Sequence, residues 1–336
     1  MSKLVTIGIP VYKRLEYLPN VLHIVAAQDY PNIDVLVSDN GMNGTAVPEI
    51  VAKHYHKPYR FRQNSSTVSA SNHFTQLIDS AAGEYYMMLA DDDEISPNYV
   101  SELLHLLERH PEASAALAIE ETIDGAGNVL RRSKDTVPEI LSGPDFIRAT
   151  WGTREYRLEA LCTFLAKTEK LIACGGFPDI WAATSDEDLL MVKLCLDNFI
   201  AFSTRCTFRK RFYETSGGFA IELQDLARGI QEFLACLDSD PRILKYAALH
   251  SAEWNELRRY LINSAWKTYY FRWAGMYQKR LTSMQWLRAA FGLPPEYYRL
   301  VMHTLIQHFI GIFVEKGKKH LPWVYEIYRG AKARRL

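Results

Sequence analysis

The chain has 336 residues, a length that corresponds to about two domains of ordinary size. Apolar residues make up 48% of it and charged residues 23%, which excludes a wholly disordered or fibrous protein. The net charge is zero, but residues 240–336 hold 17 basic and 6 acidic residues, so this stretch carries +11 and the preceding 239 residues carry −11. This asymmetry indicates two different kinds of partner.

The five cysteines form no C-x-x-C pair, and they predict neither a disulfide framework nor a metal knuckle. We therefore expect a reducing cytoplasm. The longest apolar run, residues 305–314, is shorter than the ~20 residues that cross a bilayer, and the N-terminus reads as a first strand. The expected location is cytoplasmic, with the inner face of the membrane as an alternative place of attachment.

Two periodicities alternate over the first hundred residues. Apolar, β-branched runs predict strands at 4–11, 34–38, 59–62 and 84–90, and helical spacing predicts helices at 17–28, 47–54 and 71–82. Such a β-α-β-α-β-α-β order is typical of an α/β protein with a parallel, doubly wound, Rossmann-like sheet.

The next segment continues this mixture. We predict a helix at 97–110, a strand at 113–121, a hairpin turn at 125–128, a strand at 161–166, a helix from 168, a helix after Ser185 as its N-cap, and strands over 199–213.

From about residue 217 the chain reads as helices. We expect them at 222–237, 247–276, 283–291 and 296–314. This part holds five of the seven tryptophans and many Arg and Lys residues. It is a basic, aromatic module with three possible roles. Its helices could form a core of their own, bind anionic lipid, or join copies of the chain in a homo-oligomer. No motif supports nucleic-acid binding.

The sharpest chemical signal is Asp91-Asp92-Asp93 at the end of a predicted strand. Neighbouring carboxylates repel by about 1 kcal/mol or more per close pair at partly buried sites. Mg²⁺ or Mn²⁺, which prefer oxygen ligands, would relieve this repulsion. The alternative is a solvated acidic turn that caps the next helix.

Three further features have two interpretations each. Asp39-Asn40-Gly41 is either an ordinary turn or a contact for a base or ribose. The run 185–188 (Ser-Asp-Glu-Asp) is either a helix start or the site of a general base. The basic run 205–211 is either a solvated strand or a contact for a diphosphate.

An ordered set of segments resembles the family 2 glycosyltransferases of the GT-A fold. The set comprises residues 5–12, residues 35–41, residues 64–72, residues 82–93 with Pro97 beyond, and Gly175-Gly176-Phe177 followed by Glu187-Asp188. The resemblance extends over residues 4–213. It implies a mostly parallel GT-A sheet, a catalytic domain at residues 1–215 and a helical C-terminal module at 216–336.

The resemblance also implies roles for individual residues. Pro10, Tyr12, Asp39, Asn64, Asn72, Asp91 and Asp92 would bind the nucleotide-diphosphate sugar donor. Asp91 and Asp93 would hold Mn²⁺ or Mg²⁺, with Asp93 as the more direct ligand. Asp188 matches the catalytic base, but the Asp-x-Asp-Leu that often follows is replaced by Leu189-Leu190-Met191, so Asp186 is the alternative. The common glutamate two residues after the Tyr12 equivalent is Arg14 here.

The implied activity is inverting transfer of one hexosyl or deoxyhexosyl group to a glycan or lipid-linked saccharide, in surface-polysaccharide synthesis. A Gln-x-x-Arg-Trp motif of processive synthases is absent. The chemistry agrees, because a metal-assisted leaving group and a single separate base suffice for one displacement. A nucleotidyltransferase or an NAD enzyme would need a glycine-rich loop that residues 10–14 do not supply. A glycan-binding scaffold that kept the fold is the alternative.

Overall fold

The computed structural model describes residues 2–153, 163–212 and 221–266. By its internal contacts the chain divides into two compact units, Met1–Tyr269 and Tyr270–Leu336, and every described residue belongs to the first. The boundary predicted near residue 215 falls within 213–220, outside the described residues. The division into a catalytic domain and a C-terminal module stays a prediction.

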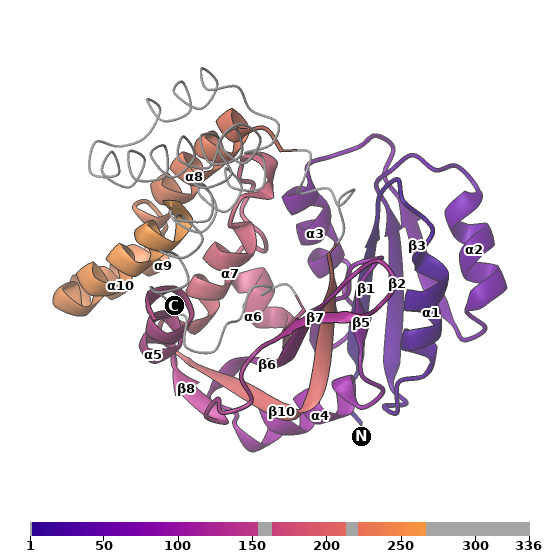
Figure 1. Ribbon diagram of the computed structural model, residues 1–336, viewed down its shortest axis with the longest axis horizontal. Coiled ribbons are helices and arrows are strands. Elements are labelled where there is room, and N and C mark those ends of the chain that lie inside the picture. The colour runs from indigo at the N-terminus through magenta and orange to yellow at the C-terminus, as the bar shows by residue number, and fades with distance from the viewer. Residues whose placement is uncertain (1, 154–162, 213–220, 267–336) are drawn as a thin grey trace, which may run out of the picture. The chain divides into compact units, whose positions relative to one another are not determined.

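In the described part, ten strands form one mixed sheet of order β3-β2-β1-β4-β9-β6-β10-β5 (Figure 1). The strands are β1 (Val5–Val11), β2 (Ile33–Asp39), β3 (Tyr59–Gln63), β4 (Tyr85–Met88), β5 (Glu94–Ile95), β6 (Ala113–Ile123), β7 (Val129–Arg132), β8 (Ile140–Ser142), β9 (Leu165–Lys167) and β10 (Phe199–Arg211). β7 pairs with β6, and β8 pairs with β10.

The helices of the first half are α1 (Leu18–Ala26), α2 (Ala46–His54), α3 (Ala70–Asp79) and α4 (Tyr99–Arg109). Those of the second half are α5 (Gly143–Ile147), α6 (Thr168–Ala173), α7 (Asp186–Cys195), α8 (Leu223–Leu237), α9 (Pro241–Leu249) and α10 (Ser251–Ser264), with a π-helical turn η1 (Arg148–Gly152) and a 3-10 turn η2 (Trp181–Ala183).

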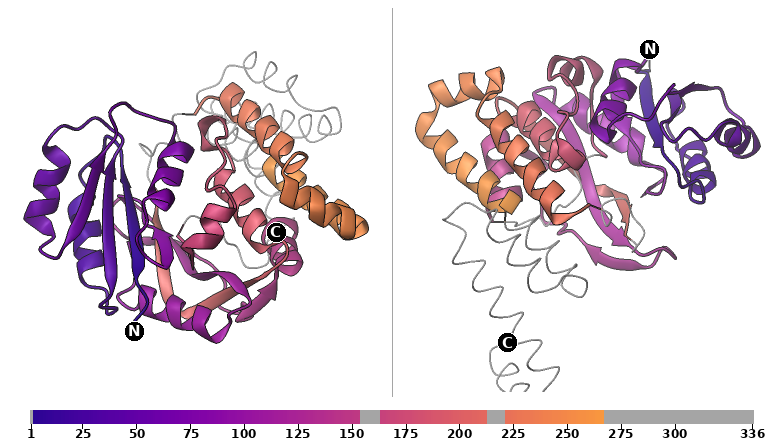
Figure 2. Two further views of the ribbon diagram at one scale, coloured as in Figure 1. Left: turned by 180° about the vertical axis from the view of Figure 1, so that it is seen from behind. Right: turned by 90° about the horizontal axis from the view of Figure 1, so that it is seen from above.

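The N-terminal half confirms the predicted doubly wound sheet. Strands β3, β2, β1 and β4 are parallel neighbours. Helices α1 and α2 lie on one face and α3 on the other, as both views show (Figures 1 and 2). All seven residues of β1 are buried because helices cover both faces, and this explains their near-continuous apolar pattern. The carboxyl ends of these strands therefore meet at one edge of the sheet.

The second half of the sheet is built on β6 and β10, which run parallel. Strand β10 also pairs with β5 in antiparallel fashion, with Arg209 opposite Glu94. This pairing brings the end of β10 beside the segment that follows β4, although the two are more than a hundred residues apart in sequence.

Two sequence predictions are wrong in detail. The long helix expected over 247–276 is interrupted at His250, whose backbone (φ −130°, ψ 48°) is not helical, so α9 and α10 are separate helices in the described part. Ser185 does not cap α7 through its side chain, because its backbone is left-handed (φ 58°) and its hydroxyl makes no capping bond. The helices expected at 283–291 and 296–314 lie outside the described residues.

The described helices α8–α10 pack on the body of the first unit. Arg148 pairs with Glu253 (2.8 Å) and Glu256 (3.2 Å) of α10, and Arg242 of α9 donates to the Ala173 carbonyl (2.6 Å). In the part of the chain that the structure covers, no helix is long and apolar enough to cross a bilayer.

Candidate active site

The aspartate turn, Asp91-Asp92-Asp93, follows β4 and leads directly into strand β5. It is therefore not the cap of a helix, and that alternative is wrong. Asp93 is only 5% exposed, and burial raises the pKa of its carboxyl well above the ordinary value. Burial, with the Asp92 carboxylate as the next cause, raises the pKa of Asp91 to about 7. Ionising both groups is costly in the protein alone.

The aspartate turn is held by Arg211, the last residue of β10. Its backbone N–H donates to Asp93 Oδ1 (2.8 Å), and its Nε donates to the Asp92 carbonyl (2.9 Å). Its Nη1 donates to the carbonyls of Asp124 (3.0 Å) and Gly125 (3.2 Å), in the turn between β6 and β7. The side chain is only 4% exposed, so the guanidinium ties two chain turns together inside the protein.

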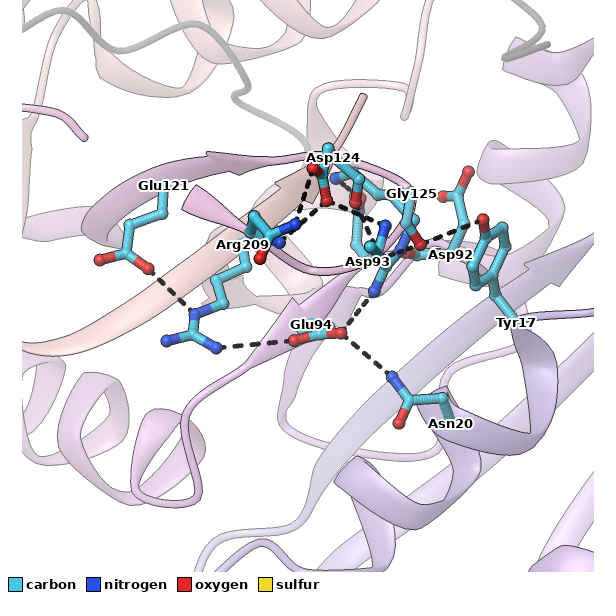
Figure 3. A network of polar contacts seen from close by, with 12 residues as sticks. Tyr17, Asn20, Asp92, Asp93, Glu94, Glu121, Asp124, Gly125 and Arg209 are labelled. Atoms are coloured by element: carbon cyan, nitrogen blue, oxygen red, sulfur yellow. Dashed lines mark hydrogen bonds and ion pairs between the residues drawn. The ribbon is translucent and has the colours of Figure 1, made fainter. Parts of the chain in front are cut away.

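Next to this arginine, Glu94, Arg209 and Glu121 form a chain of ion pairs, and Figure 3 labels all three. Glu94 pairs with Arg211 and with Arg209 (3.7 Å), and it accepts from Asn20 (3.2 Å). The Arg211 guanidinium also lies 4.7 Å from the ring centre of Tyr17.

The rest of the basic run is engaged as well. Arg209 bonds Glu121 (3.0 Å), and Arg205 bonds Glu102 (2.8 Å). A diphosphate contact from residues 205–211 stays a prediction, and the interpretation as a purely solvated strand does not hold for Arg211.

Three of the residues expected to bind the nucleotide-sugar donor, Pro10, Tyr12 and Asp39, lie at the ends of β1 and β2. Pro10 is buried within β1, and Tyr12 follows it with 49% exposure. Arg14 lies 3.8 Å from the Asp92 carboxylate. The Arg14 charge and a hydrogen bond from the Tyr12 backbone both act to lower the pKa of Asp91, against burial. The structure thus brings the end of β1 to the aspartate turn.

Asp39 organises the turn after β2. Its carboxylate accepts from the Gly41 N–H (2.7 Å), from the Asn43 N–H (3.0 Å) and amide (2.8 Å), and from Gln63 (2.9 Å). A Cβ at Gly41 would lie 1.8 Å from the Tyr12 carbonyl oxygen, so this close approach requires glycine. Asp39 is fully buried, and the geometry agrees with ordinary turn chemistry; its contact with a base stays a prediction.

Asn64 and Asn40 form a buried amide pair behind that turn. Asn64 Nδ2 donates to Asn40 Oδ1 (2.9 Å), and Asn40 Nδ2 donates to the Val68 carbonyl (3.0 Å). These bonds fix the segment between β3 and α3.

Helix α3 connects the donor side to the second acidic cluster. Ser69 Oγ and Asn72 Nδ2 both donate to Asp179 (2.7 and 2.9 Å), so the Asn72 amide is engaged within the protein. Thr75 bonds the Phe177 backbone, and a Cβ at Gly176 (φ 66°) would lie 2.7 Å from the Thr75 side chain. The Gly175-Gly176-Phe177 turn therefore packs this closely against α3 only with glycine at position 176.

The two candidate bases occupy the first turn of α7 in different settings. Asp186 accepts from Ser71 Oγ (2.7 Å) and from the Glu187 N–H (2.8 Å), and burial raises its pKa to about 7. Asp188 accepts from the indole N–H of Trp151 (3.2 Å). That indole packs edge-on against Phe146, with ring centres 5.8 Å apart.

Sequence reasoning missed several of these residues. Ser71 and Trp151 bond the candidate bases, and Asp179 bonds Ser69 and Asn72 at the start of α3. Trp151 and Asp179 lie outside the segments that carry the resemblance, and only tertiary contacts bring them into the site. Arg211 stood in the basic run, whose sequence pattern gives no sign that one member is buried.

The carboxylate oxygens of the aspartate turn are suitable ligands for a divalent cation. Mg²⁺ and Mn²⁺ are typically held by one or two carboxylates, with substrate phosphates completing the oxygen set. Asp91 and Asp93 supply two carboxyl groups of this kind, the first half-buried and the second buried. No cluster of three or more His, Cys, Asp or Glu side chains suited to a metal occurs within the described ranges.

The fold is shared with solved glycosyltransferases. Staphylococcus aureus TarS (residues 1–349) in complex with UDP-GlcNAc superposes with a TM-score of 0.65 and 14% identity, covering 94% of this chain and 92% of that one. A Pyrobaculum calidifontis mannosyltransferase in complex with GDP-Man and Mn²⁺ gives 0.52 and 15%, covering 92% and 87%. Together they define the class of the fold, a GT-A glycosyltransferase.

The sequence comparisons name the family. The family model "Glycosyl transferase family 2" matches residues 6–178, and the chain belongs to this family of glycosyltransferases. An uncharacterized glycosyltransferase of Rickettsia conorii is 31% identical over 217 residues, 64% of this chain and 35% of that protein. The abequosyltransferase RfbV of Salmonella typhimurium is 29% identical over 97 residues, 28% of this chain and 29% of that one. The chain thus spans about a third of the length of these relatives.

Proposed function

We propose that the protein transfers one sugar from a nucleotide-diphosphate donor to a saccharide acceptor, with inversion at the anomeric carbon. The observation that carries the proposal is the aspartate turn, in which the buried Asp93 and the half-buried Asp91 both have a raised pKa, at the carboxyl edge of a parallel sheet. Ligands of such sheets bind at this edge. The nucleotide sugars named for TarS and for the mannosyltransferase support a donor of the same class.

Asp91 and Asp93 would hold Mn²⁺ or Mg²⁺, and Asp92 would face the ribose or donor sugar. A divalent cation there would stabilise the charge that develops on the departing nucleotide diphosphate. The chain's own part is to hold the turn in place, through Arg211 and the strand pairing of β5 with β10. Pro10, Tyr12, Asp39, Asn64 and Asn72 would line the donor pocket as the family resemblance implies.

Asp188 is the proposed base. It would accept the proton of the acceptor hydroxyl as that oxygen bonds to the anomeric carbon, while the carbon–oxygen bond to the diphosphate breaks. Both oxygens of Asp186 already accept hydrogen bonds, from Ser71 and from the Glu187 backbone. Since the family resemblance matches Asp188 to the base, and these bonds hold Asp186 at the α7 start, we assign Asp186 to the architecture of that turn and Asp188 to proton transfer.

The proposed acceptor is a glycan or a lipid-linked saccharide, at the cytoplasmic face of a membrane. The relative named abequosyltransferase supports transfer of a deoxyhexose-type sugar as one case of this chemistry. The excess of basic residues after residue 240 supports contact with anionic lipid. Co-sedimentation with vesicles that contain or lack anionic lipid tests this attachment, and equal sedimentation with both would remove it.

The direct test of donor binding is calorimetry of the full chain with UDP, dTDP and GDP, with and without Mn²⁺. We expect one nucleotide to bind, and to bind more tightly with Mn²⁺. No binding of any nucleotide in the presence of metal would contradict the proposal. A screen of nucleotide sugars for donor hydrolysis then identifies the sugar without an acceptor.

A further inference from the structure

The segment that leads into α7 has a strained backbone. Ala182, Ala183 and Ser185 have φ values of 56°, 51° and 58°, in the left-handed region that non-glycine residues seldom adopt. Each such residue destabilises the fold, and it persists only where its surroundings impose it. The segment from Trp181 to Ser185, here called the α7 entry turn, ends one residue before Asp186 and three before Asp188.

The hydroxyl groups of the α7 entry turn do not stabilise it. The hydroxyls of Thr184 and Ser185 are buried, and neither has a hydrogen-bond partner among the described residues. A buried hydroxyl without a partner destabilises the fold. Contacts from other elements must therefore help to hold this turn.

Helix α8 supplies that constraint through Trp181. The Trp181 backbone N–H donates to Glu232 (2.7 Å), and its indole N–H donates to Asp225 (2.8 Å). The Arg228 guanidinium lies 3.7 Å from the ring centre, and it also bonds Glu232 (2.9 Å). Three side chains on successive turns of α8 thus contact Trp181, two through hydrogen bonds and one through its ring.

Gly229 sets how closely α8 approaches. A Cβ at this position would lie 2.5 Å from both the Thr184 hydroxyl and the Trp181 carbonyl oxygen. Glycine in a helix interior is less stable than alanine, so its presence there needs a reason. Contact with the α7 entry turn explains why this position is glycine.

We propose that α8 is a positioning element for the catalytic base, acting through Trp181 and Gly229 on the α7 entry turn. The proposal rests on the assignment of Asp188 as the base. The four α8 residues, Asp225, Arg228, Gly229 and Glu232, lie beyond residue 178, where the match to the family model ends, and so do α7 and Asp188. A displacement of about 1 Å at a catalytic group can cost on the order of a hundredfold in rate.

The test separates turnover from donor binding. Donor hydrolysis is measured with the nucleotide sugar that the hydrolysis screen identifies, and nucleotide affinity is measured by calorimetry with Mn²⁺. Gly229→Ala should lower kcat at least tenfold and leave the nucleotide Kd within twofold. Gln231→Ala, an exposed change on the same helix, is the matched control and should leave both unchanged.

A second pair of variants separates positioning from loss of stability. Asp225→Ala removes the acceptor of the Trp181 indole N–H and should lower kcat about tenfold, whereas Asp225→Asn keeps a carbonyl acceptor and should restore most of it. Thermal unfolding of each variant shows whether it folds, and the Asp225 pair decides the question if Gly229→Ala does not fold.

The outcomes are distinguishable. Unchanged kcat in both Gly229→Ala and Asp225→Ala, or a loss confined to nucleotide affinity, would overturn the proposal that α8 positions the catalytic base. An active Asp188→Asn would instead overturn the assignment of the base. Failure of the unaltered protein to bind any nucleotide would overturn the proposed function.

Discussion

The backbone N–H of Arg211 donates to the carboxylate of Asp93 over 2.8 Å, although the two residues are 118 positions apart in the chain. The bond exists because β10 returns beside the aspartate turn and pairs with β5. The end of the second half of the sheet therefore fixes a candidate metal ligand that belongs to the first half. This relationship makes Arg211 a test of how the donor site is built.

Arg211→Lys should weaken Mn²⁺-dependent nucleotide binding about tenfold. Lysine keeps the charge but cannot reproduce the guanidinium fork that reaches Asp92, Asp124 and Gly125 together. Calorimetry with and without Mn²⁺ measures the effect. Arg132→Gln on strand β7 is the control, since Arg132 pairs with Glu121 at a half-exposed position and lies outside the basic run 205–211. Equal losses in the two variants would argue against a special role for Arg211.

Asp93→Asn should abolish the stimulation of nucleotide binding by Mn²⁺ and leave the fold intact. The amide oxygen can still accept from the Arg211 N–H, while the anionic oxygen that a cation needs is gone. Without metal we expect the variant to be at least as stable as the parent, because a buried carboxyl of raised pKa has been removed. Thermal unfolding with and without Mn²⁺ measures both effects. Normal Mn²⁺ stimulation would move the metal site elsewhere.

Asp188→Asn should lower kcat by about 10²–10⁴-fold, the usual contribution of a general base. Nucleotide affinity should stay close to that of the parent, since the change lies outside the donor pocket. Donor hydrolysis and calorimetry give the two quantities. Absence of activity in the unaltered protein with every donor tried, together with intact nucleotide binding, would favour a glycan-binding scaffold.

Asp186 predicts a dependence of stability on pH. Its pKa is raised from 3.8 to about 7 in the folded protein, so the folded chain holds one more proton than the unfolded chain between these values. The contribution of Asp186 to the free energy of unfolding is therefore fully present below pH 3.8 and is lost as the pH rises through about 7. Asp186→Asn should flatten this part of the profile and unfold at a higher temperature than the parent at pH 8. Urea titrations from pH 4 to 8 measure it, and an identical slope in the two proteins would contradict it.

The strand ends were predictable from the sequence because a buried parallel strand leaves an apolar run that stops at its polar end. Thus β1, β2 and β4 end within two residues of their predicted limits or inside them, and the aspartate turn follows β4 as predicted. The role of Arg211 was not predictable, since its partners come from three other segments. Serine commonly caps helices, so Ser185 was expected to cap α7. The packing of α8 on the α7 entry turn instead holds the Ser185 backbone in a left-handed conformation, which prevents the capping bond.

The break at His250 was not predictable from the periodicity of the sequence. Asp240 caps α9 by accepting from the Arg242 N–H (2.9 Å), and α10 follows with Trp254, Leu257 and Leu261 buried. Both segments have helical spacing, so the change of direction between them leaves the pattern of apolar residues almost unaltered.

The central claim is tested most directly by a crystal of the full chain grown with Mn²⁺ and the nucleotide that calorimetry selects. The account predicts anomalous density from manganese between the diphosphate and the carboxylate oxygens of Asp91 and Asp93, with Arg211 still bonded to the aspartate turn. Bound nucleotide without metal at those oxygens, or aspartates turned away from the diphosphate, would contradict it.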